Sequence, residues 1–123
     1  MFFFGENSEH LKAVVVLETL KEDLARSTLF LSKEEVLIQK TKSLISFLTA
    51  ALDHLKHEAQ IVSMREYQKM RYELVEELQR MERIKERSYF YKQQIVDLTE
   101  RIDRQRLLIS TLKSKVLEFK RDR

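Results

Sequence analysis

The sequence has no proline, no cysteine, no tryptophan and a single glycine, Gly5, among its 123 residues. β-Sandwiches, barrels and doubly wound sheets need a turn roughly every 8–12 residues, and those turns draw on Gly, Pro, Asn and Asp. Gly-rich phosphate-binding loops need two or three glycines at fixed spacing. The shortage of turn-forming residues therefore excludes both groups and predicts an all-α protein built from long helices.

The absence of cysteine excludes disulfides, thiol catalysis and Cys-based zinc sites, and it fits a reducing compartment. Long apolar runs are missing too: the longest weakly charged run, residues 43–52, is about half of what a membrane span needs. The opening MFFFG is followed by Glu6 and not by the apolar stretch of a secretory signal. We therefore expect an intracellular, cytoplasmic protein without a membrane span.

The second half of the chain carries a long heptad repeat, and 35% of all residues are charged, as is typical of coiled coils. From Tyr67 to Phe119 the apolar residues alternate at spacings of three and four, which predicts a coiled-coil helix over residues 63–123. β-Branched residues at one heptad position and Leu at the other favour a parallel two-stranded coil. The predicted partner-binding seam consists of Tyr91, Ile95, Leu98, Ile102, Gln105, Ile109, Leu112, Val116 and Phe119.

The first half, residues 8–62, repeats differently. Apolar residues recur every seven residues from Leu17 to Ala59, but the companion positions Ser27, Glu34 and Thr41 are polar. The neighbouring flank supplies apolar residues instead: Val16, Phe30, Leu37, Leu44 and Ala51. Such a wide apolar stripe predicts contact with more than one helix, as in a helical bundle.

Boundaries between helices are signalled only by two Ser-x-x-Glu capping boxes, which begin at Ser32 and Ser63. The second box coincides with a slip of one residue between the two heptad registers, which predicts a break near residues 60–66. We expect a flexible end over residues 1–7, a helical segment over 8–62 that is continuous or broken near 32, and the coiled-coil helix over 63–123. Two arrangements stay open: a bent, nearly continuous rod and an antiparallel hairpin.

Basic residues line both sides of the predicted seam. Residues 1–60 have a net charge of −2, from 7 basic and 9 acidic residues, whereas residues 61–123 have +5, from 16 and 11. The basic flanks are Arg80, Lys85, Arg87, Lys92, Arg101, Arg106, Lys113, Lys115 and Lys120. In a homodimer these flanks repel each other at a cost of about 1–2 kcal/mol, well below the gross gain from burying the seam. The sequence therefore predicts either self-association as a parallel dimer or a helical protein partner with acidic flanks, with Gln105 fixing the register.

The sequence gives only weak signs of metal binding, catalysis or nucleic-acid binding. His54 and Glu58 have the i, i+4 spacing of a metal pair, but both histidines of this stretch fall on the outer face of the heptad, where we expect solvated side chains. No catalytic triad or concave site is readable, so we expect no enzymatic activity, no cofactor and no metal. Acidic residues interrupt the basic run of residues 80–87, which makes nucleic-acid binding the less favoured alternative.

We therefore interpret the chain as a non-enzymatic coiled-coil scaffold or adaptor subunit, of a cytoplasmic or cytoskeletal kind, that assembles through the seam. The alternative functions are a basic coiled coil that binds nucleic acid or another anionic surface, and a small monomeric hairpin adaptor. Further apolar residues lie outside the seam, for which we expect packing against the N-terminal half or a second contact with another protein: Tyr72, Val75, Leu78, Tyr89, Phe90, Val96, Leu107, Leu108 and Leu117.

Overall fold

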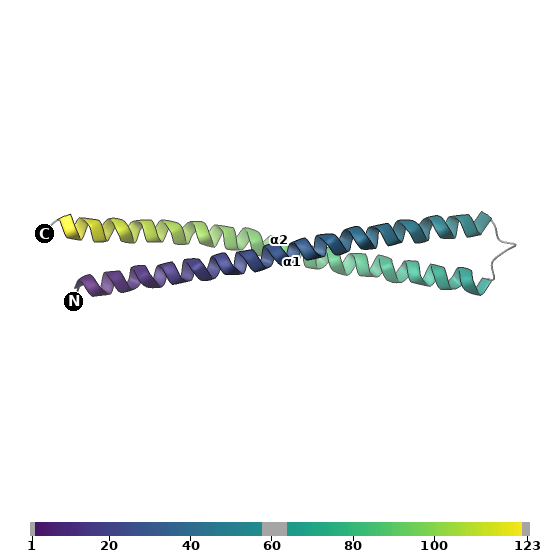
Figure 1. The fold of residues 1–123 in the computed structure, drawn as a ribbon, viewed down its shortest axis with the longest axis horizontal. Coiled ribbons are helices and arrows are strands. Elements are labelled where there is room, and N and C mark those ends of the chain that lie inside the picture. The colour runs from purple at the N-terminus through teal and green to yellow at the C-terminus, as the bar shows by residue number, and fades with distance from the viewer. Residues whose placement is uncertain (1, 58–63, 122–123) are drawn as a thin grey trace. The chain divides into compact units, whose positions relative to one another are not determined.

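The protein is folded into two long α-helices in a computed structural model, which describes the backbone of residues 2–57 and 64–121 and the side chains of residues 8–57 and 64–120 (Figure 1). Helix α1 spans Phe2–His57 and helix α2 spans Met64–Arg121. No β-strand occurs within these ranges. The prediction of an all-α fold built from long helices is confirmed.

Helix α1 runs through Ser32 without interruption. Proline is absent from the chain and the single glycine lies in the first turn of α1, so no residue within the helix breaks its backbone hydrogen bonds. Hydroxyl side chains fit this pattern because they bond within the helix: Thr28 Oγ1 donates to the carbonyl of Leu24 at 2.8 Å. A Ser-x-x-Glu box therefore does not start a helix when helical residues continue on both sides of it.

The charges near the ends of the two helices suit their dipoles. The last turn of α1 contains His54, Lys56 and His57, and Nδ1 of His57 lies 2.8 Å from the carbonyl oxygen of Asp53. The first turn of α2 contains Glu66. Cationic groups stabilise the C-terminus of a helix and anionic groups the N-terminus. Ser63, the predicted capping residue, and most of the predicted break at 60–66 lie outside the described residues.

The chain divides into two compact units. Unit 1 combines Met1–Leu29 with Tyr91–Arg123, and unit 2 is the continuous stretch Phe30–Phe90. Each unit thus contains one segment of α1 and one segment of α2 (Figure 1).

In unit 1 the two helix segments pack in antiparallel orientation. Gln105 on α2 bonds to Ala13 on α1, whereas the earlier residue Gln94 accepts a bond from the later residue Ser27. The buried core between them consists of Ala13, Ser27, Leu98, Ile102 and Ile109. Small residues on α1 therefore face larger aliphatic residues on α2.

Unit 2 has the same antiparallel order, because Glu34 pairs with Arg87 while Lys56 and Tyr67 line one groove. Ile84 is its most buried large side chain, with 1% of its surface exposed. The core of this unit consists of Thr41, Leu48, Leu52, Met81, Ile84 and Ser88. Of the two arrangements left open by the sequence, the antiparallel contacts inside both units match the hairpin.

Two further sequence predictions meet the structure only in part. The backbone of α1 is helical from Phe2 onwards, whereas the side chains of residues 1–7, the predicted flexible end, lie outside the described part. Residues 58–62, the end of the predicted N-terminal segment, are not described. The proposed boundary between the two halves of the chain therefore stays a prediction.

Candidate functional site

The predicted seam of α2 lies on the face of unit 1 that packs against α1. Leu98, Ile102 and Ile109 are buried there, with exposed fractions of 9%, 4% and 8%. The remaining seam residues are partly buried: Tyr91, Ile95, Gln105, Leu112, Val116 and Phe119. The heptad spacing therefore identified the buried face of this helix correctly.

These seam residues contact a helix of the same chain, and that helix runs antiparallel to α2. The β-branched residues Ile95, Ile102, Ile109 and Val116 favoured a parallel pair, but that preference applies to separate chains. Only six residues separate the end of α1 from the start of α2, so α1 is present at a high effective concentration and in antiparallel orientation. Assembly with a second chain through the same seam stays a prediction.

Polar residues fix the register of the two helices in unit 1. The side-chain amide of Gln105 donates from Nε2 to the carbonyl oxygen of Ala13 at 2.9 Å. The Ser27 hydroxyl donates to Oε1 of Gln94 at 3.3 Å. Both bonds join α1 to α2, and a shift of either helix by one turn would leave these partly buried groups without partners. Gln105 joins two helices of the same chain, and its role in the register of an assembly with a partner stays a prediction.

An ion pair crosses the two helices in unit 2. The guanidinium of Arg87 donates from Nε to Oε1 of Glu34 at 2.9 Å and from Nη2 to Oε2 at 3.2 Å. Glu34 exposes 12% of its side chain and Arg87 47%, so the carboxylate lies in the seam and the guanidinium reaches it from the flank. Two parallel bonds between a guanidinium and a carboxylate give a well-defined geometry. Heptad positions alone did not reveal this pair, because the register between the helices was unknown.

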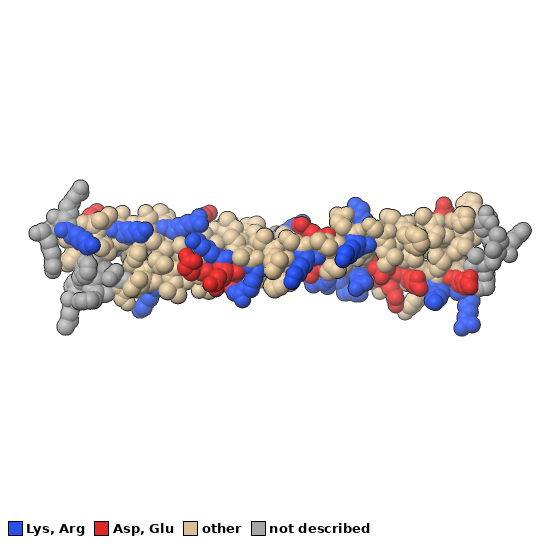
Figure 2. All heavy atoms as spheres, viewed as in Figure 1, with Lys and Arg blue, Asp and Glu red and all other residues tan. Residues whose placement is uncertain are grey.

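The nine predicted basic flank residues are all exposed. Ion pairs join Arg80 to Glu77, Arg87 to Glu34, and Arg101 to Asp97. Figure 2 shows Lys and Arg side chains gathered over the C-terminal part of α2. Among the described side chains, the following flank residues have no acidic partner: Lys85, Lys92, Arg106, Lys113 and Lys115.

The apolar residues of α2 outside the seam remain exposed after the helices have packed. Leu107 exposes 69% of its surface, Tyr72 67% and Tyr89 66%. The other six that the sequence singled out are exposed as well: Val75, Leu78, Phe90, Val96, Leu108 and Leu117. The expectation that the N-terminal half covers them is therefore wrong, because one straight helix covers only the seam of its neighbour.

Helix α1 likewise keeps a wide apolar surface. The predicted flank of the stripe is exposed at Val16, Phe30, Leu37 and Leu44. A second set of exposed residues on the same helix was not predicted from the sequence: Leu11, Val15, Leu29, Val36 and Phe47. Their signal was present in the sequence, since Leu29 and Val36 directly precede Phe30 and Leu37 and widen the stripe. Contiguous exposed apolar surface of this kind commonly marks an interaction site.

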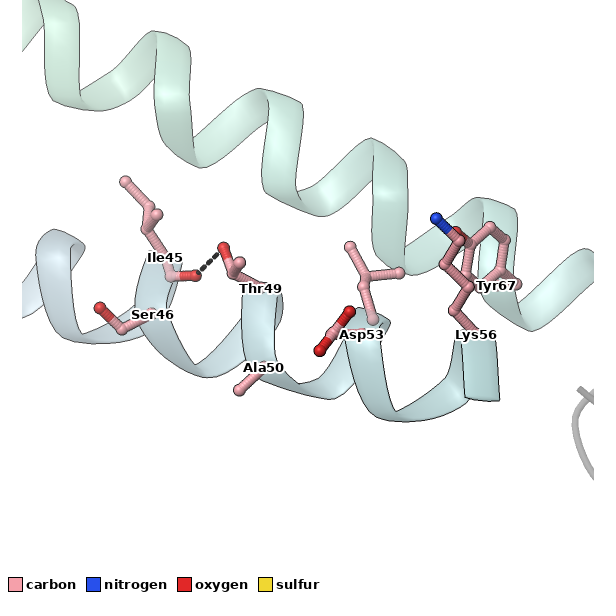
Figure 3. A pocket seen from close by; sticks show the side chains of 8 residues that line it. Ile45, Ser46, Thr49, Ala50, Asp53, Lys56 and Tyr67 are labelled. Atoms are coloured by element: carbon pink, nitrogen blue, oxygen red, sulfur yellow. Dashed lines mark hydrogen bonds between the residues drawn. The ribbon is translucent and has the colours of Figure 1, made fainter. Parts of the chain in front are cut away.

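A groove of about 590 Å³ runs beside the seam in unit 2 and is open to solvent. Ile45 and Thr49 point from α1 toward α2, and Lys56 and Tyr67 also line it (Figure 3). The Thr49 hydroxyl donates to the carbonyl of Ile45 at 2.7 Å and so is engaged by its own helix. The groove therefore offers a ligand a mostly apolar surface and not a set of aligned polar groups.

The described residues contain no group of three or more His, Asp or Glu side chains arranged to hold a metal ion. Of the weak metal pair suggested by the sequence, Glu58 lies outside the described residues. Neither α1 nor α2, as far as each is described, has a stretch long and apolar enough to span a membrane.

No protein-family model matches the chain, and neither curated proteins nor solved structures give a match.

Proposed function

We propose that the chain is a non-enzymatic helical scaffold or adaptor, which binds other proteins through the outside of its two packed helices. The observation that carries this proposal is the exposure of large apolar side chains on both helices after α1 and α2 have packed: Phe47 exposes 67% of its surface and Leu107 69%. The seam residues hold the two helices of one chain together. The proposed partner binds to the exposed apolar residues, which are accessible while the seam is occupied by the helices of the chain itself.

The free energy of burying apolar side chains supports a binding role for this surface. Burial of a large apolar side chain is worth about 1.5–3 kcal/mol. These side chains are already partly covered, so burying the remaining surface of four or five of them supplies about 3–8 kcal/mol, at the lower end of the roughly 4–15 kcal/mol that association costs. Apolar contact alone then gives weak binding, so charged residues beside it decide which partner is accepted.

The proposal is tested by photo-crosslinking in the cells that make the protein. A photoreactive amino acid replaces Phe47 in one variant and the exposed Gln39 of the same helix in a matched control. We expect protein adducts of discrete mass from position 47 and none of the same mass from position 39. The same pattern from both positions, or no adduct from position 47, would contradict the proposal.

A second candidate function, binding to nucleic acid or another anionic surface, is favoured by exposed basic residues of α2 that have no acidic partner within the described part of the chain, such as Lys113 and Lys115. Its test is the affinity for a DNA duplex at several salt concentrations. Each phosphate contact contributes about −0.9 to the slope of log affinity against log salt. A slope of about −4 or steeper would support this function, and an absence of binding at low salt would exclude it.

A further inference from the structure

A single stripe of residues on α1 combines apolar and basic side chains within unit 2. Its members are spaced by three and four residues, so they share one face of the helix. We call this set the α1 stripe: Phe30, Lys33, Leu37, Lys40, Leu44 and Phe47. All six are exposed, and none belongs to the core of the unit.

The apolar members of the α1 stripe differ in their exposure. Phe30, Leu37 and Leu44, beside the seam, expose 42%, 38% and 41% of their surfaces, whereas Phe47, one position further out, exposes 67%. Side chains beside a seam are partly covered by the neighbouring helix, so they form the side of a shallow furrow between two helices. A third helix laid along this furrow would bury all four residues.

Basic residues lie along the outer edge of the α1 stripe and on the flank of α2 beside it, where they form a border. Lys33 and Lys40 lie on the stripe itself, and Nζ of Lys33 lies 6.0 Å from the centre of the Phe30 ring. Glu34 lies between Phe30 and Leu37 on the surface of α1, and it binds Arg87 of α2. Arg87 is therefore on the same side of unit 2 as the α1 stripe. Arg80 lies seven residues before Arg87 and shares this flank of α2.

The acids of this border lie toward the start of α2, where the exposed Glu73 shares the flank of Arg80 and Arg87. The border is therefore positive beside Phe30, Lys33 and Lys40 and not beside Phe47. Glu34 is committed to Arg87 at 2.9 Å, and Glu77 lies 3.8 Å from Arg80. Lys33 and Lys40 have no acidic partner among the described side chains. Figure 2 shows few charged side chains on the visible face over the C-terminal part of α1.

On this basis, and resting on the proposed adaptor function, we propose that the α1 stripe binds an amphipathic helix of a partner protein whose apolar face is flanked by Asp and Glu. The apolar face of that helix covers Phe30, Leu37, Leu44 and Phe47. Its acidic flanks approach Lys33 and Lys40 on one side and Arg80 on the other.

A second copy of the chain fits the α1 stripe less well. Two stripes packed face to face would bring the Lys33 and Lys40 side chains of both copies into one contact. Like charges placed together in an interface disfavour that partner, whereas acidic flanks remove the repulsion and add ion pairs. The positive border therefore selects a different, acidic helix.

The experiment uses the full chain and two labelled peptides of about four heptads, both with Leu at the core positions. One peptide has Glu at all flanking positions and the other has Lys. Their like-charged flanks weaken the pairing of each peptide with itself, and each peptide is used at a concentration at which it is monomeric on its own. Fluorescence anisotropy then gives the affinity of each peptide for the chain.

We expect the Glu-flanked peptide to bind about tenfold more tightly than the Lys-flanked one, since each exposed ion pair changes affinity by a small factor. The variant K33E/K40E should reverse that preference. The matched control K42E/K56E makes the same change of charge on the other flank of α1 and should keep the preference for the Glu-flanked peptide. Circular dichroism of both variants confirms that the helices are retained.

Three results would overturn the inference: equal affinity for the two peptides, equal loss of preference in both variants, or a dimer of the chain alone that Leu44→Gln dissociates. The last result would assign the α1 stripe to a second copy. If discrete crosslinks form at position 47 in cells while the peptides are bound without preference, the acidic-helix inference fails and the adaptor proposal stands. If neither occurs, both fail.

Discussion

Ile84 provides the most direct test of the helix packing, because it is the most buried large side chain in the structure, with an exposed fraction of 1%. Ile84→Ala removes three carbon atoms from the core of unit 2, and at about 0.8 kcal/mol for each buried methylene the transfer loss is about 2.5 kcal/mol. The cavity that remains destabilises the protein further, whereas the higher helix propensity of alanine stabilises it by a few tenths of a kcal/mol. We expect a decrease of about 2–3 kcal/mol in the free energy of unfolding.

Urea unfolding followed by circular dichroism measures this change as a shift of the midpoint to lower denaturant concentration. Leu107→Ala is the matched control, because Leu107 exposes 69% of its surface and should change stability by less than about 0.5 kcal/mol. If Ile84→Ala prevents folding, Ile84→Val replaces it with an expected loss of about 1 kcal/mol. Equal midpoint shifts for the Ile84 and Leu107 variants would refute the assignment of the core.

Further substitutions test the seam. Ile102→Asp should sharply reduce the helical circular dichroism signal and the melting temperature, because it places a charge at a position with 4% exposure. Glu100→Ala on the exposed face should change neither quantity. Similar effects of the two substitutions would contradict the assignment of the seam. Arg87→Ala should destabilise the chain by about 1 kcal/mol in urea unfolding, because Glu34 then keeps its charge in the seam without the guanidinium; Glu34→Leu should leave stability equal or higher. Gln105→Ala should lower the urea midpoint, since it removes the 2.9 Å bond across the helices; an unchanged midpoint would show that this bond does not contribute.

The buried face of α2 was predictable from the sequence because a heptad repeat depends only on spacing along one helix. Met81, Ile84 and Ser88 occupy successive core positions of the heptad repeat that begins at Tyr67. All three are buried, including the polar Ser88. Burial at these positions follows from the geometry of the helix, whatever the side chain. For the same reason Thr41 is buried on α1 although its polarity argued against it.

The orientation of the helices and the contacts between them could not be derived in the same way. The contact between Glu34 and Arg87 spans 53 positions of the chain, and its existence depends on where the chain reverses. No glycine or proline marks that reversal, and heptad spacing is the same for parallel and antiparallel neighbours. The apolar stripe on α1 is as wide as its sequence indicates, and the described residues leave much of it exposed, so its contact with more than one helix stays a prediction.

The two units differ in how far apart along the chain their segments lie, and this difference bears on the order in which they fold. Unit 2 is one continuous stretch, Phe30–Phe90, so its helices meet by closing a short segment at little entropic cost. Unit 1 joins segments that are more than sixty residues apart, and its bond between Ala13 and Gln105 spans 92 positions. We expect unit 2 to form before unit 1, because its contacts join residues that are closer along the chain. In that order Ile84→Ala should mainly slow folding, whereas Ile109→Ala should mainly speed unfolding.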